Sequence, residues 1–166
     1  MLITEFTQYD SVRVVLGLSA RELKDERLVN ELFYNTLIFD LTSVGYSVAA
    51  DADLVGDYQA IAADLGEATV AGRSFYSAVR VYSAHAVAFQ CLPGLSEMSP
   101  YYVSDSKAAM RKNQGETEER VTAAYFRYRS LLQEAYAAYL GVAAPESFRF
   151  NLLGISAPDF DPVTGG

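Results

Sequence analysis

Apolar side chains recur every three or four residues along two long segments of the chain, and this periodicity is typical of amphipathic helices. In residues 69–92 the repeat runs through Phe75, Val79, Tyr82, Ala86 and Phe89. Pro93 and Gly94 then end the predicted helix, because proline lacks the backbone donor that a helix interior requires. Two such long helices must bury their apolar faces against other helices, so the pattern predicts an all-α fold.

The second long segment, residues 116–140, places apolar and tyrosine side chains on a heptad-like seam and ends at Gly141. The seam comprises Val121, Tyr125, Tyr128, Leu132, Ala135 and Tyr139. Tyrosine is common both at the rim of protein cores and at protein interfaces. We therefore expect the seam to pack in the core, with a contact between subunits as the alternative.

Shorter helices are predicted before residue 69. Asp10 is expected to cap a helix that ends at Gly17, and Asp25 to cap a longer helix that ends at Gly45. A further helix covers residues 54–65. The longer helix has apolar residues around much of its circumference, which predicts extensive burial. Residues 1–144 are therefore expected to form a helical bundle of about four to five helices.

The charge of the chain restricts its partners. Asp and Glu number 21 against 13 Lys and Arg, which gives a formal net charge of −8. Such a surface repels nucleic acid and anionic membranes, so specific DNA binding is not expected. The sequence has no apolar run long enough to span a bilayer, and no membrane partner is predicted. Cys91 is the only cysteine, which excludes an intrachain disulfide.

No catalytic residue, metal site or cofactor is predicted. His85 and Cys91 are six residues apart, so they point in different directions on one helix and cannot form a nucleophile and base pair. The acidic run from Asp51 to Asp57 resembles a calcium loop, but the twelfth position, which needs a glutamate, is Ala62. These acids are better explained as helix caps.

Residues 145–166 differ from everything before them. Phe148, Phe150 and Leu152 alternate with polar residues, and Pro158 and Pro162 exclude a helix. Burial of these side chains alone does not offset the entropy lost on ordering the segment. The segment is therefore predicted to be an extended C-terminal arm that docks on another subunit or partner. The predicted contact residues are Phe148, Phe150, Leu152, Leu153, Ile155 and Phe160.

Lys107, Arg111 and Lys112 form the one compact basic cluster of the sequence. They are expected to lie at the end of a short helical segment, ahead of a break at residues 113–115. One interpretation is that they complement the negative end of that helix. The alternative is a contact patch for DNA phosphates or an acidic partner surface.

The order of parts resembles the head-tail adaptor proteins of tailed bacteriophages, also called connector or head-completion proteins. The resemblance is carried by "VLGLSARELKDERL" after a short N-terminal helix and by the block "YSAHAVAFQCLPGLSEMSPYYVSDSKAAMRK". A long tyrosine-rich helix and the ending "GISAPDFDPVTGG" follow. The resemblance covers most of the chain but includes no residue with a known chemical role.

The resemblance implies a structural virion protein without catalytic activity or cofactor. Such proteins are made in the host cytoplasm and form a ring at the head-tail interface, commonly of twelve copies. The ring lies below the portal protein and offers a surface to tail or nozzle proteins. DNA passes through it without specific binding, and the C-terminal arm contacts the portal or a neighbouring subunit.

Two other classes of protein remain open on the sequence alone. The first is a small all-α regulatory or binding module whose C-terminal arm folds over its own surface until a partner displaces it. The second is a helical enzyme, which would need a polar pocket that the sequence does not reveal. An adaptor is expected to form rings or bind the portal, whereas a module is expected to stay monomeric or dimeric.

Overall fold

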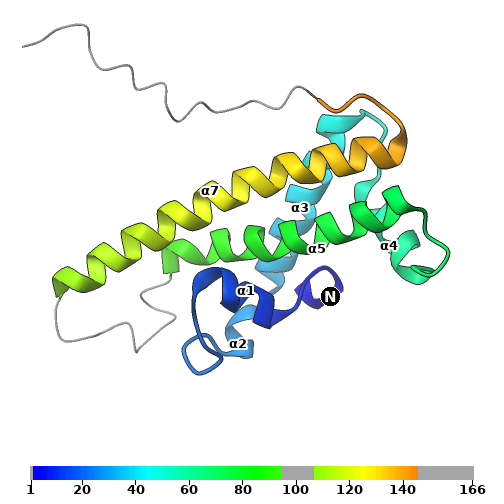
Figure 1. Cartoon of the computed structure of the whole chain (residues 1–166). Helices are drawn as coiled ribbons and strands as arrows, with labels where there is room; N and C mark the ends of the chain where they lie inside the picture. Colours follow the sequence, from blue (N-terminus) through cyan, green and yellow to red (C-terminus); the bar gives the residue numbers. More distant parts are fainter. Residues whose placement is uncertain (1, 95–106, 146–166) are drawn as a thin grey trace, which may run out of the picture.

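A computed structural model describes residues 2–94 and 107–145, and side chains for 2–94 and 115–145 (Figure 1). These residues contain six α-helices and no β-strand, which confirms the all-α prediction. Two single-turn 3-10 helices, η1 and η2, accompany them. In chain order the elements are η1 Ile3–Glu5, α1 Tyr9–Leu16, α2 Asp25–Leu28, α3 Glu31–Val48, α4 Leu54–Ala63, α5 Val70–Cys91, η2 Leu92–Gly94 and α7 Lys107–Leu140.

The long helices α5 and α7 lie side by side in opposite directions and form the centre of the molecule (Figure 1). Near one end the ring of Phe75 stacks on that of Tyr136, and further along His85 packs against Tyr128. Helices α1, α3 and α4 cover this pair, and α3 crosses it. The fully buried residues include Phe75, Val79 and Tyr82 of α5 and Leu132 and Tyr136 of α7.

Helix α7 begins earlier than the sequence predicts. The expected break at residues 113–115 is wrong, because the helix runs from Lys107 through Gly115 to Leu140. A glycine inside a helix costs only about 1 kcal/mol relative to alanine, which a long, packed helix can absorb. The predicted end at Gly141 is confirmed, since this residue has φ +70° and Val142 N donates to Ala137 O at 3.0 Å.

The two aspartates predicted as caps have a different role. Helix α1 is preceded by Gln8, and the predicted helix from Asp25 is divided at Val29 and Asn30 into α2 and α3. Both aspartates instead contact Arg13: Nη1 lies 2.7 Å from Asp10, and Nη2 pairs with Asp25. Burial lowers the pKa of Arg13, but the bonds with Asp25 and Asp10 outweigh it and raise that pKa. Asp10 and Asp25 therefore pair with the buried Arg13 and do not act as helix caps.

Other helix ends are set by capping side chains and by glycine, and two of them, at Thr69 and Gly17, lie where the sequence predicts. Asn30 Oδ1 accepts from Leu32 N at 2.9 Å and starts α3. Thr69 Oγ1 accepts from Gly72 N at 3.1 Å and starts α5. Gly17, with φ +72°, ends α1 as predicted. Helix α3 passes the predicted stop at Gly45 and ends at Val48.

Candidate functional site

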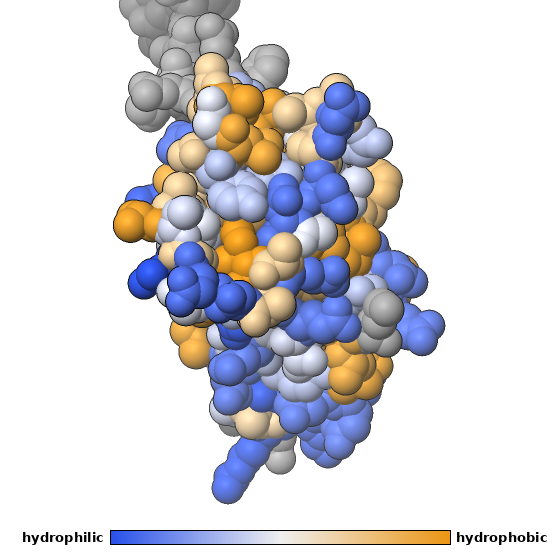
Figure 2. Space-filling model, turned by 90° about the vertical axis from the view of Figure 1, so that its right-hand side faces the viewer, coloured by the Kyte–Doolittle hydropathy of each residue, from blue (hydrophilic) through white to orange (hydrophobic). Residues whose placement is uncertain are grey.

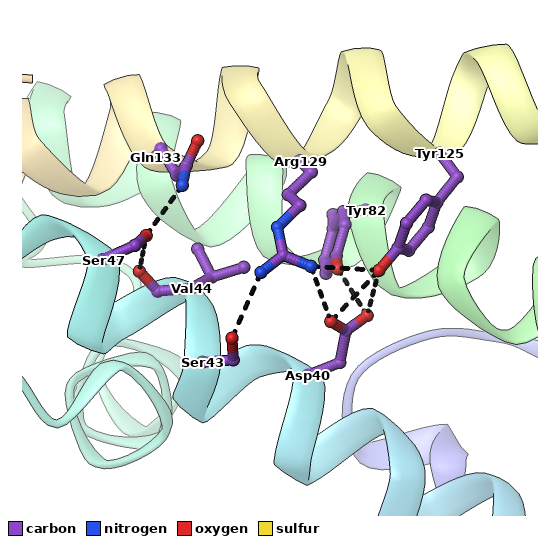
Figure 3. Close-up of polar contacts among 8 residues, drawn as sticks. All are labelled: Asp40, Ser43, Val44, Ser47, Tyr82, Tyr125, Arg129 and Gln133. Atoms are coloured by element: carbon purple, nitrogen blue, oxygen red, sulfur yellow. Dashed lines mark hydrogen bonds and ion pairs between the residues drawn. The ribbon is translucent and has the colours of Figure 1, made fainter. Parts of the chain in front are cut away.

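The most extensive polar cluster shown in Figure 3 joins three helices at Asp40 of α3. The Tyr82 hydroxyl of α5 donates to its Oδ2 at 2.5 Å, and the Tyr125 hydroxyl of α7 lies 2.9 Å from the same atom. Arg129 Nη1, one turn further along α7, donates to Oδ1 at 3.0 Å. Arg129 Nη2 reaches Ser43 Oγ at 3.2 Å. We call Asp40, Tyr82, Tyr125 and Arg129 the Asp40 junction.

Burial governs the electrostatics of the Asp40 junction. The side chains of Asp40 and Arg129 are 16% and 28% exposed, and they form an ion pair. Burial, followed by the charge of Asp40, raises the pKa of Tyr82 well above its usual value. Burial likewise raises the pKa of Tyr125. Both phenols therefore remain protonated donors at neutral pH.

The geometry of the Asp40 junction is that of a structural clamp. Arg129 donates to Oδ1, Tyr82 donates to Oδ2, and the Tyr125 hydroxyl lies within hydrogen-bond distance of both oxygens, so the carboxylate is engaged by three donors. The polar contact continues along α3 and α7, where Gln133 Nε2 donates to Ser47 Oγ at 2.7 Å (Figure 3). The cluster fixes α3 against α5 and α7, and its donors and acceptors are satisfied by hydrogen bonds within the cluster.

His85 and Cys91 are both packed against neighbouring residues in the structure. His85 Nδ1 lies 2.8 Å from Val81 O, one turn earlier on α5, and the imidazole packs on the ring of Tyr128 at 4.2 Å. Cys91 is completely buried, and burial raises the pKa of its thiol to about 12. A thiol in this environment stays protonated and is a poor nucleophile.

The acidic run at residues 51–57 caps and braces α4. Asp53 Oδ1 accepts from Gly56 N at 3.0 Å, as the capping interpretation predicts. Asp57 accepts a hydrogen bond from the hydroxyl of Tyr136 at 2.7 Å and so ties α4 to α7. Among the described residues, no group of three or more His, Cys, Asp or Glu side chains is arranged to hold a metal ion.

The predicted contact residues are only partly covered by the described structure. The backbone of Lys107, Arg111 and Lys112 lies in the first two turns of α7, and their side chains are outside the described set. The expectation that they end a short helix is therefore wrong. At a helix N-terminus positive charges are unfavourable, so the dipole does not explain them. Phe148, Phe150, Leu152, Leu153, Ile155 and Phe160 lie outside the described residues.

The tyrosine seam of α7 belongs largely to the core, as expected. Val121, Tyr125 and Leu132 are buried, and Tyr125 stacks on Phe89 at 4.6 Å. The sequence pattern misplaces one position, because the completely buried residue near the end of the seam is Tyr136 and not Tyr139.

The exposed face of α3 is the clearest candidate for a binding surface, and the sequence interpretation missed it. Leu32, Phe39 and Tyr46 are 67%, 77% and 63% exposed, although the sequence predicts extensive burial of this helix. They are seven residues apart, so they form one stripe along the helix. The opposite face, with Phe33, Leu37 and Leu41, packs in the core. We call Leu32, Phe39 and Tyr46 the α3 stripe.

Other surfaces carry smaller apolar groups. Figure 2 shows the end of the molecule that lies at the right of Figure 1, where hydrophobic side chains form small separate groups between hydrophilic ones. A hollow of about 310 Å³ between α4, α5 and α7 is lined in part by Asp64, Glu67, Thr69 and Tyr139. The hydroxyl of Thr69 already caps α5, and two carboxylates alone define no ligand.

Comparison with known proteins adds no family. No protein-family model, curated protein or solved structure matches the chain. Within the part of the chain that the structure describes, none of the helices has the length and apolar character needed to cross a membrane.

Proposed function

We propose that the protein is a structural adaptor of the head-tail connector type, which assembles into a ring and binds a portal protein and tail components. The observation that carries this proposal is the α3 stripe. An exposed row of Leu32, Phe39 and Tyr46 on a well-packed helical body is typical of a protein interface. The resemblance of the sequence to head-tail adaptors suggests the partners of this interface, namely a neighbouring subunit, the portal protein or a tail protein.

A ring needs two different surfaces on each copy, because a heterologous interface pairs one patch with another. The α3 stripe supplies one. The outward faces of the long helices supply candidates for the second, since Val81 of α5 and Leu131 of α7 are each 42% exposed. An interface of standard size buries about 800 Å² on each partner, so the second surface must extend beyond these two residues.

The net charge of −8 suits a ring around DNA that must let the duplex pass. Acidic side chains facing the channel would repel phosphate within a Debye length of about 8 Å. We expect the lumen to be lined by acidic residues. A lumen lined by basic side chains would contradict this part of the proposal.

The decisive experiment is electron microscopy of the full-length protein mixed with purified portal protein of the same phage. Rings attached below the portal are expected. A variant that ends at residue 144 should keep its helical circular dichroism spectrum but lose the portal complex, because the arm supplies the docking residues. A full-length protein that remains monomeric or dimeric with and without portal would instead favour a regulatory binding module.

A further inference from the structure

The α3 stripe lies on a helix face without charge. Helix α3 has two ionisable acidic residues, Glu31 and Asp40, and Asp40 is committed to the Asp40 junction. Between the three apolar side chains the exposed positions are Asn35, Thr36 and Thr42, together with Ser47 at the end of the helix. A surface of this composition favours an uncharged, apolar ligand.

One end of the α3 stripe lies where the described chain ends. Gln133 Nε2 is 2.7 Å from Ser47 Oγ, so the last turns of α3 and α7 lie at the same end of the molecule (Figure 1). Helix α7 ends at Leu140, and the described chain stops five residues later at Pro145. The chain therefore leaves the helical body beside the Tyr46 end of the stripe.

The remaining segment matches the stripe in length and chemistry. Leu32 and Tyr46 are fourteen residues apart, which corresponds to about 21 Å of helix. Residues 148–155 cover about 23 Å when extended. Residues 148–155 contain one charged side chain, Arg149, and no acidic one. A single positive charge adds no repulsion to a molecule of net charge −8.

We propose that in the free protein residues 148–155 dock on the α3 stripe of their own chain, running from Tyr46 towards Leu32. Docking within one chain is favoured because a short tether gives an effective concentration in the millimolar range. The three side chains of the stripe provide less than the ~800 Å² that each partner buries in a standard interface, so another molecule would need additional surface.

The docked segment covers apolar surface until a better partner surface is available. On the proposed function, the portal or a neighbouring subunit would displace it, so that the α3 stripe and the arm become available together. Only this consequence depends on the adaptor function. The docking itself is a property of the single chain.

Disulfide trapping tests the docking directly, because Cys91 is buried and its raised thiol pKa keeps it unreactive. The full-length variant Tyr46→Cys with Phe148→Cys is oxidised mildly and its products are separated without reductant. The control pairs Phe148→Cys with Val70→Cys. Val70 is 86% exposed and begins α5 at the same end of the molecule, where Phe75 stacks on Tyr139 at 5.3 Å.

We expect the Tyr46 pair to form an intramolecular disulfide about tenfold faster than the Val70 pair, at a rate independent of protein concentration, because docking raises the effective concentration of the thiols. Equal rates for both pairs would overturn the proposal. Disulfides mainly between molecules would also overturn it, since they would place the segment on another copy.

A tryptophan reporter gives a second, independent measurement. The chain has no tryptophan, so Phe150→Trp introduces the only one. Its emission should be shielded from iodide in the otherwise unchanged protein and exposed when Phe39→Asp places a charge in the α3 stripe. Val70→Asp is the matched control and should leave the shielding unchanged. A reporter that is equally exposed in all three proteins would refute the docking, whereas portal binding alone tests the adaptor function.

Discussion

Helix α3 buries polar residues on the side that meets α7 and exposes apolar residues on its outward side. This is the reverse of the usual distribution, in which apolar residues are buried and polar ones are exposed. Towards α7 the helix presents Asp40, whose carboxylate is fully engaged in a largely buried cluster. Towards solvent it presents Phe39, the residue immediately before Asp40, which is 77% exposed. The comparison separates two roles within one helix. The buried polar residues hold the fold, and the exposed apolar residues are available for binding.

The largest effect among the polar substitutions is expected at Asp40. Asp40→Ala removes the partner of Arg129 and leaves a poorly solvated guanidinium, so we expect a loss of about 3 kcal/mol in the free energy of unfolding. Urea denaturation measures it. As a control, the double variant Asp40→Leu with Arg129→Met removes both charges and should recover the part of the loss that comes from the unpaired guanidinium, while the hydroxyls of Tyr82 and Tyr125 still lack their acceptor. If the single variant loses less than about 1 kcal/mol, the clamp role of the Asp40 junction is wrong.

The next effect is a fall in the free energy of unfolding at alkaline pH, caused by the buried Tyr58. Burial, followed by Tyr76, raises the pKa of Tyr58 to about 12, compared with about 10 in the unfolded chain. The unfolded state therefore loses its proton first, and the stabilisation present below pH 10 falls between pH 10 and 12. The expected slope is about 1.4 kcal/mol per pH unit for this tyrosine.

Chemical denaturation from pH 8 to pH 12 measures this slope. Tyr58→Phe should lower stability at pH 8, because it loses the 3.0 Å hydrogen bond to Glu5 O. It should also flatten the decline above pH 10. An unchanged slope in this variant would show that Tyr58 does not titrate as described.

A smaller loss is expected from one hydroxyl of the Asp40 junction. Tyr82→Phe keeps the ring in the core but removes the 2.5 Å hydrogen bond to Asp40. Hydrogen bonds to charged groups contribute about 1.5 to 3 kcal/mol, so we expect a loss near 2 kcal/mol by urea denaturation. Tyr76→Phe, which changes a hydroxyl outside the junction, is the control and should cost less.

The sequence predicts what depends on local pattern. The period of apolar residues identifies α5 and its end at Pro93, and Gly141 marks the end of α7. Gly115 misled the prediction because a glycine is also tolerated within a long packed helix. Asp25 misled it because the sequence does not show that a buried arginine, Arg13, would take the carboxylate.

The candidate sites divide in the same way. The Asp40 junction could not be predicted, because its partners are 42 to 89 residues away along the chain and meet only when the helices pack. The α3 stripe, in contrast, was within reach of the sequence. Leu32, Phe39 and Tyr46 recur every seven residues, on the side of the helix away from Phe33, Leu37 and Leu41. A helix with two apolar faces can bury one in the core of its own molecule, and the other is then available to a partner.

The smallest effect on stability is expected on the apolar side of the comparison. In a protein that ends at residue 144, where no C-terminal segment can cover the side chain, Phe39→Ala should change the free energy of unfolding by no more than about 0.5 kcal/mol, as for other exposed positions. The same substitution at Phe33, on the same helix but only 8% exposed, should cost about 3 to 5 kcal/mol. Urea denaturation of the two variants measures this difference between the faces of α3.

Phe39 must then show its effect in binding and not in folding. In the adaptor assay, Phe39→Ala should reduce ring formation or portal attachment, because the substitution removes the most exposed side chain of the α3 stripe. Normal assembly by this variant would place the interface elsewhere. A larger loss of stability in the full-length protein than in the protein that ends at residue 144 would show that the C-terminal segment packs on Phe39 in the free protein.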